Sequence, residues 1–254
     1  MIFYEQPLNE RIRTFLRLDF LFSQAKNSLD NTSVWDTRAT IASIIDIQNI
    51  FNRIDMKLEV LKELERHSAS LTRLENNPNI NKNRLNSILD QIDSFVDQLH
   101  AVDGQIGHKL RENEFINSIK QRISTPGGTC DFDLPAYHFW LQQPVDIRIQ
   151  NLRKWINEFE IVNSAIQLLL LLTRESAPPR KSVAESGFFQ SSLDTNLPYQ
   201  IIRVGVPDSS PYYAEISAGK HRFTIRFVKP SAANGERPVQ AGSDVDFELT
   251  CCVI

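Results

Sequence analysis

The sequence has few cysteines and none of the short motifs that hold metals or phosphates. Its three cysteines, Cys130, Cys251 and Cys252, are odd in number and two are adjacent, which is not the pattern of a secreted disulfide scaffold. No histidine or further cysteine stands beside them at zinc-ligand spacing. The chain also lacks HExxH, GxGxxG, GxSxG and phosphate-loop motifs. We therefore expect a protein of a reducing compartment that has no metal or other cofactor and is not an enzyme.

The sequence also lacks an excess of positive charge and a long apolar run. It has 28 Lys and Arg against 31 Asp and Glu, a net charge of −3. Nucleic-acid binding is therefore disfavoured, because it relies on a positive field. The most apolar run, residues 166–172, is far shorter than the ~20 residues that cross a bilayer. The first residues do not resemble a signal peptide. We expect a cytoplasmic protein without membrane insertion.

The first two-thirds of the chain has the periodicity of helices. Apolar residues recur at spacings of three and four, most regularly from Leu85 to Leu99. Trp35 is expected to pack as a hydrophobic staple at the start of the second helix. Helices are predicted over residues 9–29, 36–54, from 56 onward, 85–99, 111–123, 144–159 and 160–174.

Residues 121–140, QRISTPGGTCDFDLPAYHFW, cannot form one continuous helix. Pro126 lacks a backbone N–H, and the two glycines after it permit backbone angles that other residues avoid. Asp133 is expected to cap a short helix that starts at Pro135. The aromatic residues of that helix have large apolar areas, so we expect the segment to be docked against the helices around it.

After Ser176 the pattern becomes that of strands. The paired prolines 178 and 179 stop a helix, and alternating apolar residues follow. Strands are predicted over residues 186–190, 199–206, 212–217, 220–228 and 244–253, with a hairpin at SAGK and a long loop over 230–242. The predicted class is α+β: a helical domain over residues 1–177 and a smaller antiparallel β-domain over 178–254. Residues 2–4 are a candidate extra strand of the β-domain.

The segment KHRFTIRFV predicts a strand with a basic face. With a period of two, Phe223, Ile225 and Phe227 point to the core, while Lys220, Arg222, Thr224 and Arg226 point outward. Two interpretations are open. The basic row is balanced by Asp244, Asp246 and Glu248 if the last strand is its neighbour. Otherwise its guanidinium groups are available to carboxylates of a partner.

Other cations on the helical side pose the same choice. Arg13 and Arg17 are four residues apart and share one side of a helix, where Glu10 and Asp19 are potential partners. His138 stands among aromatic residues, where a packed histidine with one hydrogen bond is the usual outcome. A nucleophile and base formed by Cys130 and His138 is disfavoured, because no orienting motif accompanies them.

Nine segments together resemble the ZapD family of bacterial cell-division proteins. They are PLNERIRTFLRLDFL, VLKELER, IGHKLRENEF, KQRISTPGG, FDLPAYHFWL, RESAPPRK, GFFQ, KHRFTIRF and DFELTCC. The resemblance implies a helical N-terminal domain, a C-terminal β-domain and a homodimer without catalysis. It implies binding to the C-terminal tail of FtsZ, bundling of FtsZ filaments, and action at the midcell Z-ring in septation.

The resemblance also implies which residues contact the partner. They are Arg222, Arg226 and Lys220 of the basic strand, with Arg13, Arg17, His138 and Arg174 on the helical side. At Asn113 and Glu114 this chain departs from relatives that are more basic there. Two alternatives remain open: an adaptor of the same fold that binds another acidic peptide, and a nucleic-acid-binding regulator, which the acidic balance disfavours. The apolar faces of the helices at 85–99 and 168–172 predict a homodimer that buries ~2,000 Å² or more of helical surface.

Overall fold

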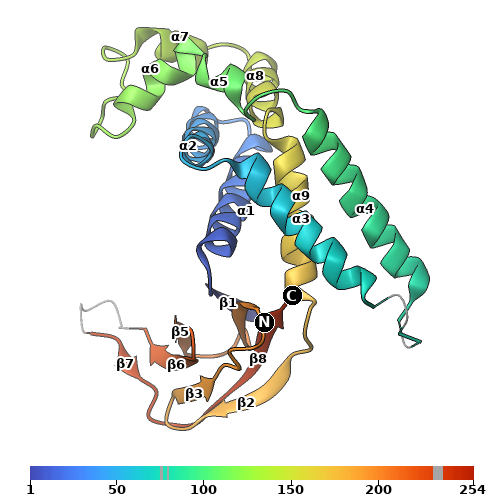
Figure 1. Cartoon of the computed structure of the whole chain (residues 1–254). Coiled ribbons are helices and arrows are strands. Elements are labelled where there is room, and N and C mark those ends of the chain that lie inside the picture. Colours follow the sequence, from blue (N-terminus) through green and yellow to red (C-terminus); the bar gives the residue numbers. More distant parts are fainter. Residues whose placement is uncertain (75–76, 79, 231–236) are drawn as a thin grey trace. The chain divides into compact units, whose positions relative to one another are not determined.

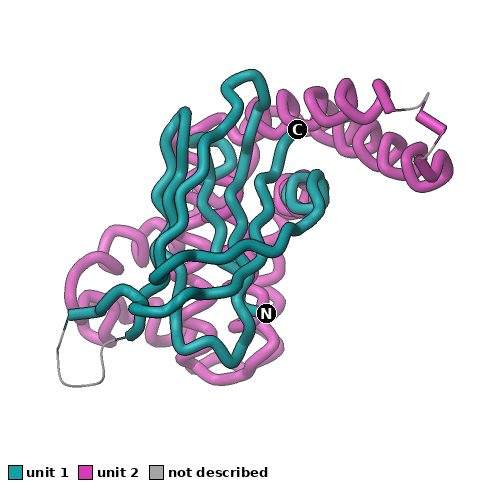
Figure 2. The backbone as a smooth tube through the Cα atoms, turned by 90° about the horizontal axis from the view of Figure 1, so that it is seen from below, with its two compact units in different colours: residues 1–13, 170–254 teal, residues 14–169 magenta. Residues whose placement is uncertain are grey.

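The computed structural model describes residues 1–74, 77–78, 80–230 and 237–254, and this part of the chain divides into two compact units (Figure 2). Residues 14–169 form the helical unit, and residues 1–13 with 170–254 form the β-unit, which holds the described strands. The predicted α+β class, helices followed by antiparallel strands, is confirmed.

The helices follow the predicted apolar periodicity closely. Polar side chains define several of their starts: Ser33, Asp55, Asn81 and Asn113 each accept a hydrogen bond from the backbone N–H three residues later. The helices in Figure 1 are α1 (Glu10–Leu29), α2 (Val34–Phe51), α3 (Met56–Thr72), α4 (Lys82–Ala101), α5 (His108–Arg111), α6 (Glu114–Arg122), α7 (Pro135–Leu141), α8 (Val145–Asn157) and α9 (Glu160–Arg174).

Trp35 does not have the packed position predicted for it. It lies inside the first turn of α2, with 78% of its surface exposed. The reason is the start of the helix, because Ser33 caps α2 two residues before Trp35 and the residue is no longer at the staple position. Trp35 contacts the guanidinium of Arg38 instead, at 5.5 Å from the ring centroid.

The corner after α6 is docked through its aromatic residues, as predicted. Tyr137 and Trp140 of α7 lie within 6.1 Å and 5.5 Å of Phe115 by ring centroid, and Trp140 also contacts Trp155 at 5.6 Å. The predicted cap is wrong. Leu134 is the N-cap residue, and Asp133 accepts a hydrogen bond from the Cys130 thiol at 3.3 Å instead.

The strands form two antiparallel sheets around one apolar core. The first sheet has the order β1-β4-β8-β2, and the second has the order β3-β6-β5 with β7 also paired to β6. Buried side chains of both sheets, among them Val204, Phe223, Phe227 and Phe247, form the core of the β-unit. The strands are β1 (Ile2–Pro7), β2 (Arg180–Ala184), β3 (Phe188–Ser192), β4 (Tyr199–Val206), β5 (Tyr213–Ala218), β6 (Arg222–Lys229), β7 (Val239–Gln240) and β8 (Val245–Val253).

A two-residue turn carries the chain from the first sheet to the second. Ser186 and Gly187 both have positive φ angles, 48° and 73°, and Glu185 pairs with Phe188 across them. Two consecutive positive φ angles favour glycine and match the twist of the strands they join. β3 therefore begins at Phe188, two residues after the start of the strand predicted over residues 186–190. β2 was not predicted. Residues 231–236 of the predicted loop lie outside the described residues, and β7 follows them.

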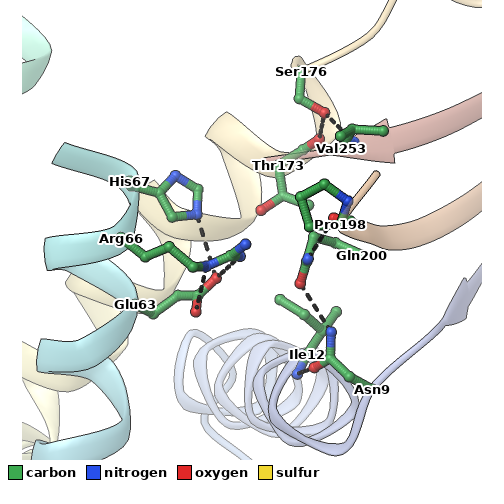
Figure 3. A network of polar contacts seen from close by, with 10 residues as sticks. All are labelled: Asn9, Ile12, Glu63, Arg66, His67, Thr173, Ser176, Pro198, Gln200 and Val253. Carbon is green, nitrogen blue, oxygen red and sulfur yellow. Dashed lines mark hydrogen bonds and ion pairs between the residues drawn. The ribbon is translucent and has the colours of Figure 1, made fainter. Parts of the chain in front are cut away.

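Residues near both ends of the chain are joined inside the β-unit. β1 pairs with β4 along Ile2–Pro7 at the edge of the first sheet. Beyond this strand, Asn9 donates to Gln200 at 2.8 Å, and the backbone of Val253 donates to Ser176 Oγ at 2.9 Å (Figure 3). These bonds tie both chain ends to the sheet.

The helical unit contains its own buried polar group on α3, drawn in Figure 3. Glu63 is 1% exposed and accepts a hydrogen bond from Arg66 Nε at 3.2 Å, with His67 Nε2 3.6 Å from Glu63 Oε1. An ion pair one helical turn apart lowers the cost of burying this carboxylate.

No single helix in the described part of the chain is both long and apolar enough to cross a bilayer. By length and composition alone, α8 and α9 meet that test only as a pair, and the break between them bends by 64°.

Candidate partner-binding surface

The outward face of the second sheet carries the predicted basic row. Phe223, Ile225 and Phe227 of β6 are at most 1% exposed, while Arg222 and Arg226 are exposed on the opposite side. This alternation confirms the period of two expected from the sequence. The exposed side is called the β6 basic face below, and its central residues are Arg222, Thr224 and Arg226.

The strands beside β6 complete this face. In the antiparallel register Phe188 and Glu215 stand on either side of Arg226, and Ser192 stands beside Arg222. Phe188 is 42% exposed, so an apolar side chain is accessible next to the cations. The face therefore combines two guanidinium groups, one exposed aromatic ring and one carboxylate.

The interpretation that β6 pairs with the last strand is wrong. β6 lies in the second sheet and β8 in the first, with β4 and β2 as the neighbours of β8. Asp246 and Glu248 therefore do not balance the basic row. No ion pair joins Arg222 or Arg226 to a carboxylate among the described residues, including Glu215 opposite Arg226.

Lys220 lies outside the strand that was predicted to contain it. β5 ends at Ala218 and β6 begins at Arg222, so Lys220 and His221 are exposed residues of the connecting turn. The Gly219 N–H donates to the Arg222 carbonyl at 2.9 Å and closes that turn. Lys220 adds positive charge at one end of the β6 basic face, on a less rigid support than a strand.

The two arginines of α1 have different surroundings. Arg13 Nε lies 3.0 Å from Glu10 Oε1, which confirms one of the two proposed partners. Asp19 accepts a hydrogen bond from Gln167 at 2.7 Å. Arg17 is exposed and has no ion pair among the described residues. Phe20, one turn further and 67% exposed, places an apolar side chain beside Arg17.

His138 is exposed, so the packed position predicted for it is wrong. It occupies the outer side of α7, next to Phe139, which is 70% exposed. Tyr137 takes the inward position instead, and burial raises the pKa of its hydroxyl to about 12, although the charge of Arg38 opposes that shift. A helix of seven residues exposes about half of its side chains, and the aromatic content alone does not show which ones.

Arg174 is held inside the β-unit by a carboxylate. Its Nε and Nη2 atoms donate to the two oxygens of Glu5 at 2.9 Å and 2.8 Å. Arg203 Nε lies 3.2 Å from Glu5 Oε1 without hydrogen-bond geometry, and its guanidinium covers the Phe3 ring at 3.7 Å. Glu5 thus connects β1 to both arginines, and Arg174 has fewer donors left for a partner than Arg222 or Arg226.

Sequence reasoning did not single out Phe188 or Phe20 as surface residues. A signal for Phe188 is present in GFFQ, because two adjacent aromatic residues in a strand must point to opposite faces. Phe189 takes the core position and Phe188 the outer one.

The comparison with known proteins assigns the family. The profile of the ZapD family, described as a cell division protein, matches residues 16–226. This chain belongs to the ZapD family. A cell division protein ZapD from Methylococcus capsulatus is 44% identical over 253 residues, covering 100% of this chain and 98% of the relative. ZapD proteins of Coxiella burnetii and Chromobacterium violaceum are 36% and 38% identical, each over at least 98% of both chains. Membership in ZapD supports a role in cell division.

Proposed function

We propose that this ZapD-family chain binds the C-terminal tail of FtsZ and, as a homodimer, cross-links and bundles FtsZ filaments. It would then act in the cytoplasm at the midcell Z-ring and promote septation. The observation that carries this proposal is the pair of exposed guanidinium groups on β6, Arg222 and Arg226, beside the exposed ring of Phe188. Arg17, Phe20 and His138 supply further exposed contacts on the helical unit.

The chemistry of the β6 basic face suits a tail that mixes carboxylates with apolar residues. Guanidinium groups bind carboxylates in a bidentate manner, and each such contact contributes roughly 1.5–3 kcal/mol. Because the two arginines stand on a strand, their spacing is fixed before the partner arrives. Phe188 provides an apolar contact in the same register.

Bundling requires two binding sites in one particle, which a homodimer supplies. Large apolar side chains are exposed elsewhere on the helical unit, among them Phe132 and Phe139, each at least 70% exposed. We propose that helical surface of this kind is buried between two copies.

We propose binding, not catalysis, as the activity. The sequence lacks the motifs of the common nucleophilic, phosphate-binding and zinc-dependent enzymes. An adaptor for another acidic peptide is the alternative that the β6 basic face also fits. A nucleic-acid-binding regulator fits less well, because the chain carries a net charge of −3.

Fluorescence anisotropy with an FtsZ tail peptide tests the site. Arg222→Ala should weaken binding by about five- to a hundredfold, with the fold retained by circular dichroism, because the side chain fills no part of the core. Arg226→Ala should have a smaller effect, since Glu215 beside it already offsets part of its field. Glu215→Gln should therefore strengthen binding, and all affinities should fall as salt rises.

Lys181→Ala is the matched control, because Lys181 is an exposed cation on β2 of the other sheet. If Lys181→Ala weakens binding as much as Arg222→Ala, the peptide responds to total charge and the assigned face is wrong.

Co-sedimentation with FtsZ filaments tests bundling, and light scattering tests the dimer. Filaments should pellet as bundles with this protein, and FtsZ without its tail should not. A protein that remains monomeric at micromolar concentration would contradict the cross-linking mechanism. Bundling of tail-less FtsZ would instead favour a different attachment.

A further inference from the structure

A pocket of about 210 Å³ lies in the helical unit at the connection between α2 and α3. The connection itself forms one wall, and residues 105, 106 and 111 form the other. None of the residues assigned to tail binding lines it. Three of its lining side chains are cations: Arg53, Lys57 and Arg111.

A fourth cation, Lys120 of α6, is close to this group. Burial lowers the pKa of the Lys120 ammonium, and the charges of Arg111 and Arg53 lower it further. Lys120 is therefore repelled by Arg111 and Arg53, in a chain whose net charge is negative. Such an arrangement costs free energy unless an anion is present.

The polar contacts of the pocket fix the cations without neutralising them. Arg111 Nε donates to Asn52 Oδ1 at 3.0 Å and its Nη1 donates to Gln105 Oε1 at 2.7 Å. Lys57 Nζ donates to the Val102 carbonyl at 2.7 Å. These acceptors are neutral, so they orient the charges and leave Arg111 Nη2 and two Lys57 protons unused among the described residues.

The described carboxylates balance this group only in part, through Asp55. None of the four cations has a carboxylate within ion-pair distance in the part of the chain that the structure describes. Asp55 lines the pocket, but one of its oxygens accepts the Leu58 N–H at 3.1 Å as the cap of α3. The start of α3, at Met56 and Lys57, adds the positive end of a 17-residue helix to the lining.

We propose that this pocket binds the phosphate group of a small phosphorylated anion. A phosphate carries up to two negative charges and presents several acceptors, which matches an oriented guanidinium with three further cations better than a single carboxylate does. A volume of about 210 Å³ admits one or two phosphate groups and excludes a folded partner. This site is separate from the β6 basic face and does not depend on the function proposed for that face.

Isothermal titration calorimetry tests the proposal with inorganic phosphate, pyrophosphate and AMP, at ionic strength held constant with sodium chloride. One pyrophosphate should bind per chain, more tightly than phosphate because it carries more charge. Saturable binding of AMP, with or without that of the free ions, also supports the site and shows that a phosphomonoester is accepted. The absence of saturable binding for all three anions would overturn it.

Substitutions distinguish binding in the pocket from a general effect of the protein's positive charges. Lys120→Gln should weaken pyrophosphate binding about tenfold without loss of any described hydrogen bond, and Arg111→Gln should weaken it at least as much. Lys154→Gln, an exposed cation on α8 outside the pocket, should leave binding unchanged. An equal loss in Lys154→Gln would overturn the proposal. So would an acidic peptide that displaces pyrophosphate from the wild type at matched charge, because the site would then prefer carboxylates.

Discussion

Charged residues of the β-unit differ in whether their charge is paired within the unit. Arg222 and Arg174 are both arginines that the family resemblance marks for partner binding, yet only Arg174 is held by a partly buried carboxylate. The two substitutions should therefore have different effects. Arg222→Ala should weaken binding and leave stability intact, whereas Arg174→Ala should lower stability.

Arg174→Ala should lower the free energy of unfolding by about 1–3 kcal/mol, because Glu5 loses a two-point charge-assisted partner in a site only 17% exposed. Thermal denaturation followed by circular dichroism measures the loss. Arg13→Ala is the control, since its pair with Glu10 is exposed and should contribute about 0–0.5 kcal/mol. Equal melting temperatures for Arg174→Ala and the wild type would show that the Glu5 pair contributes little.

Cys252 predicts a pH dependence at the same scale. Burial, and after it the carboxylate of Glu5, raises the pKa of this thiol from 9.0 to about 11, although Arg203 and Arg174 oppose the shift. The unfolded chain releases the thiol proton first as pH rises. The contribution of Cys252 to the free energy of unfolding is therefore fully present below about pH 9 and is lost between about pH 9 and 11. Cys252→Ala should flatten the fall in stability over that window, measured by urea denaturation.

Alkylation of the native protein with iodoacetamide measures how accessible the cysteine thiols are. Cys252 is 0% exposed, whereas Cys130 is partly exposed in the corner before α7. At pH 8 Cys130 should therefore be modified well before Cys252, and the two should react alike in denaturant. Equal rates in the native protein would mean that the β-unit opens readily around β8.

At the scale of elements, the turn between β2 and β3 depends on one glycine. Gly187 has a φ of +73°, and a Cβ there would lie 2.8 Å from the Ala241 backbone oxygen. Gly187→Ala should cost at least ~1–2 kcal/mol, because it adds backbone strain to a contact that no side-chain rotation relieves. Gly104→Ala is the matched control: its φ is +75° but nothing lies within 4 Å of the added Cβ. Similar melting temperatures for the two variants would show that backbone strain alone, without the contact to Ala241, accounts for the loss of stability.

The helices were predictable because their signals are local, although the start of α2 and the cap of α7 were not placed correctly. The spacing of Leu85, Ile92 and Leu99 specifies α4 and its buried side without knowledge of any neighbour. Sheet pairing is not local, so the basic strand was assigned the wrong neighbour. β8 complements β6 in charge, yet β6 pairs with β3 and β5. β2 was missed because it follows the prolines directly and has five residues, and β3 follows it after a two-residue turn.

The candidate site was predictable only in part, for a related reason. A period of two fixes which residues of β6 face outward, so Arg222 and Arg226 follow from the sequence. Whether a described carboxylate pairs with them depends on the strands beside β6, which the sequence does not reveal. Aromatic neighbours suggested burial for His138, and the expected helix start at Asp36 suggested a packed staple for Trp35. Their exposure depends on how α7 is oriented and on where α2 begins.

At the scale of the whole molecule, the first strand belongs with the last third of the chain. Deletion of residues 2–7 should uncover the edge of β4 and remove Glu5 from its two arginines. We expect a lower melting temperature and concentration-dependent aggregation, because an unpaired edge invites pairing between chains. Ile2→Ser is the control, since Ile2 is 42% exposed and its backbone pairing remains. Light scattering during a thermal ramp measures both. Soluble, fully stable protein after the deletion would show that β1 is dispensable.

The position of β8 between β4 and β2 also sets an order of events during synthesis. The helical unit is complete in sequence at residue 169, whereas β1 leaves the ribosome first and waits for β4. At about 5–20 residues per second that wait is roughly 10–40 s. β8 is made after the other described strands, and it fills an interior position of its sheet. The first sheet therefore cannot be completed, and its buried face cannot close over the core that it shares with the β6 sheet, until β8 has been synthesised.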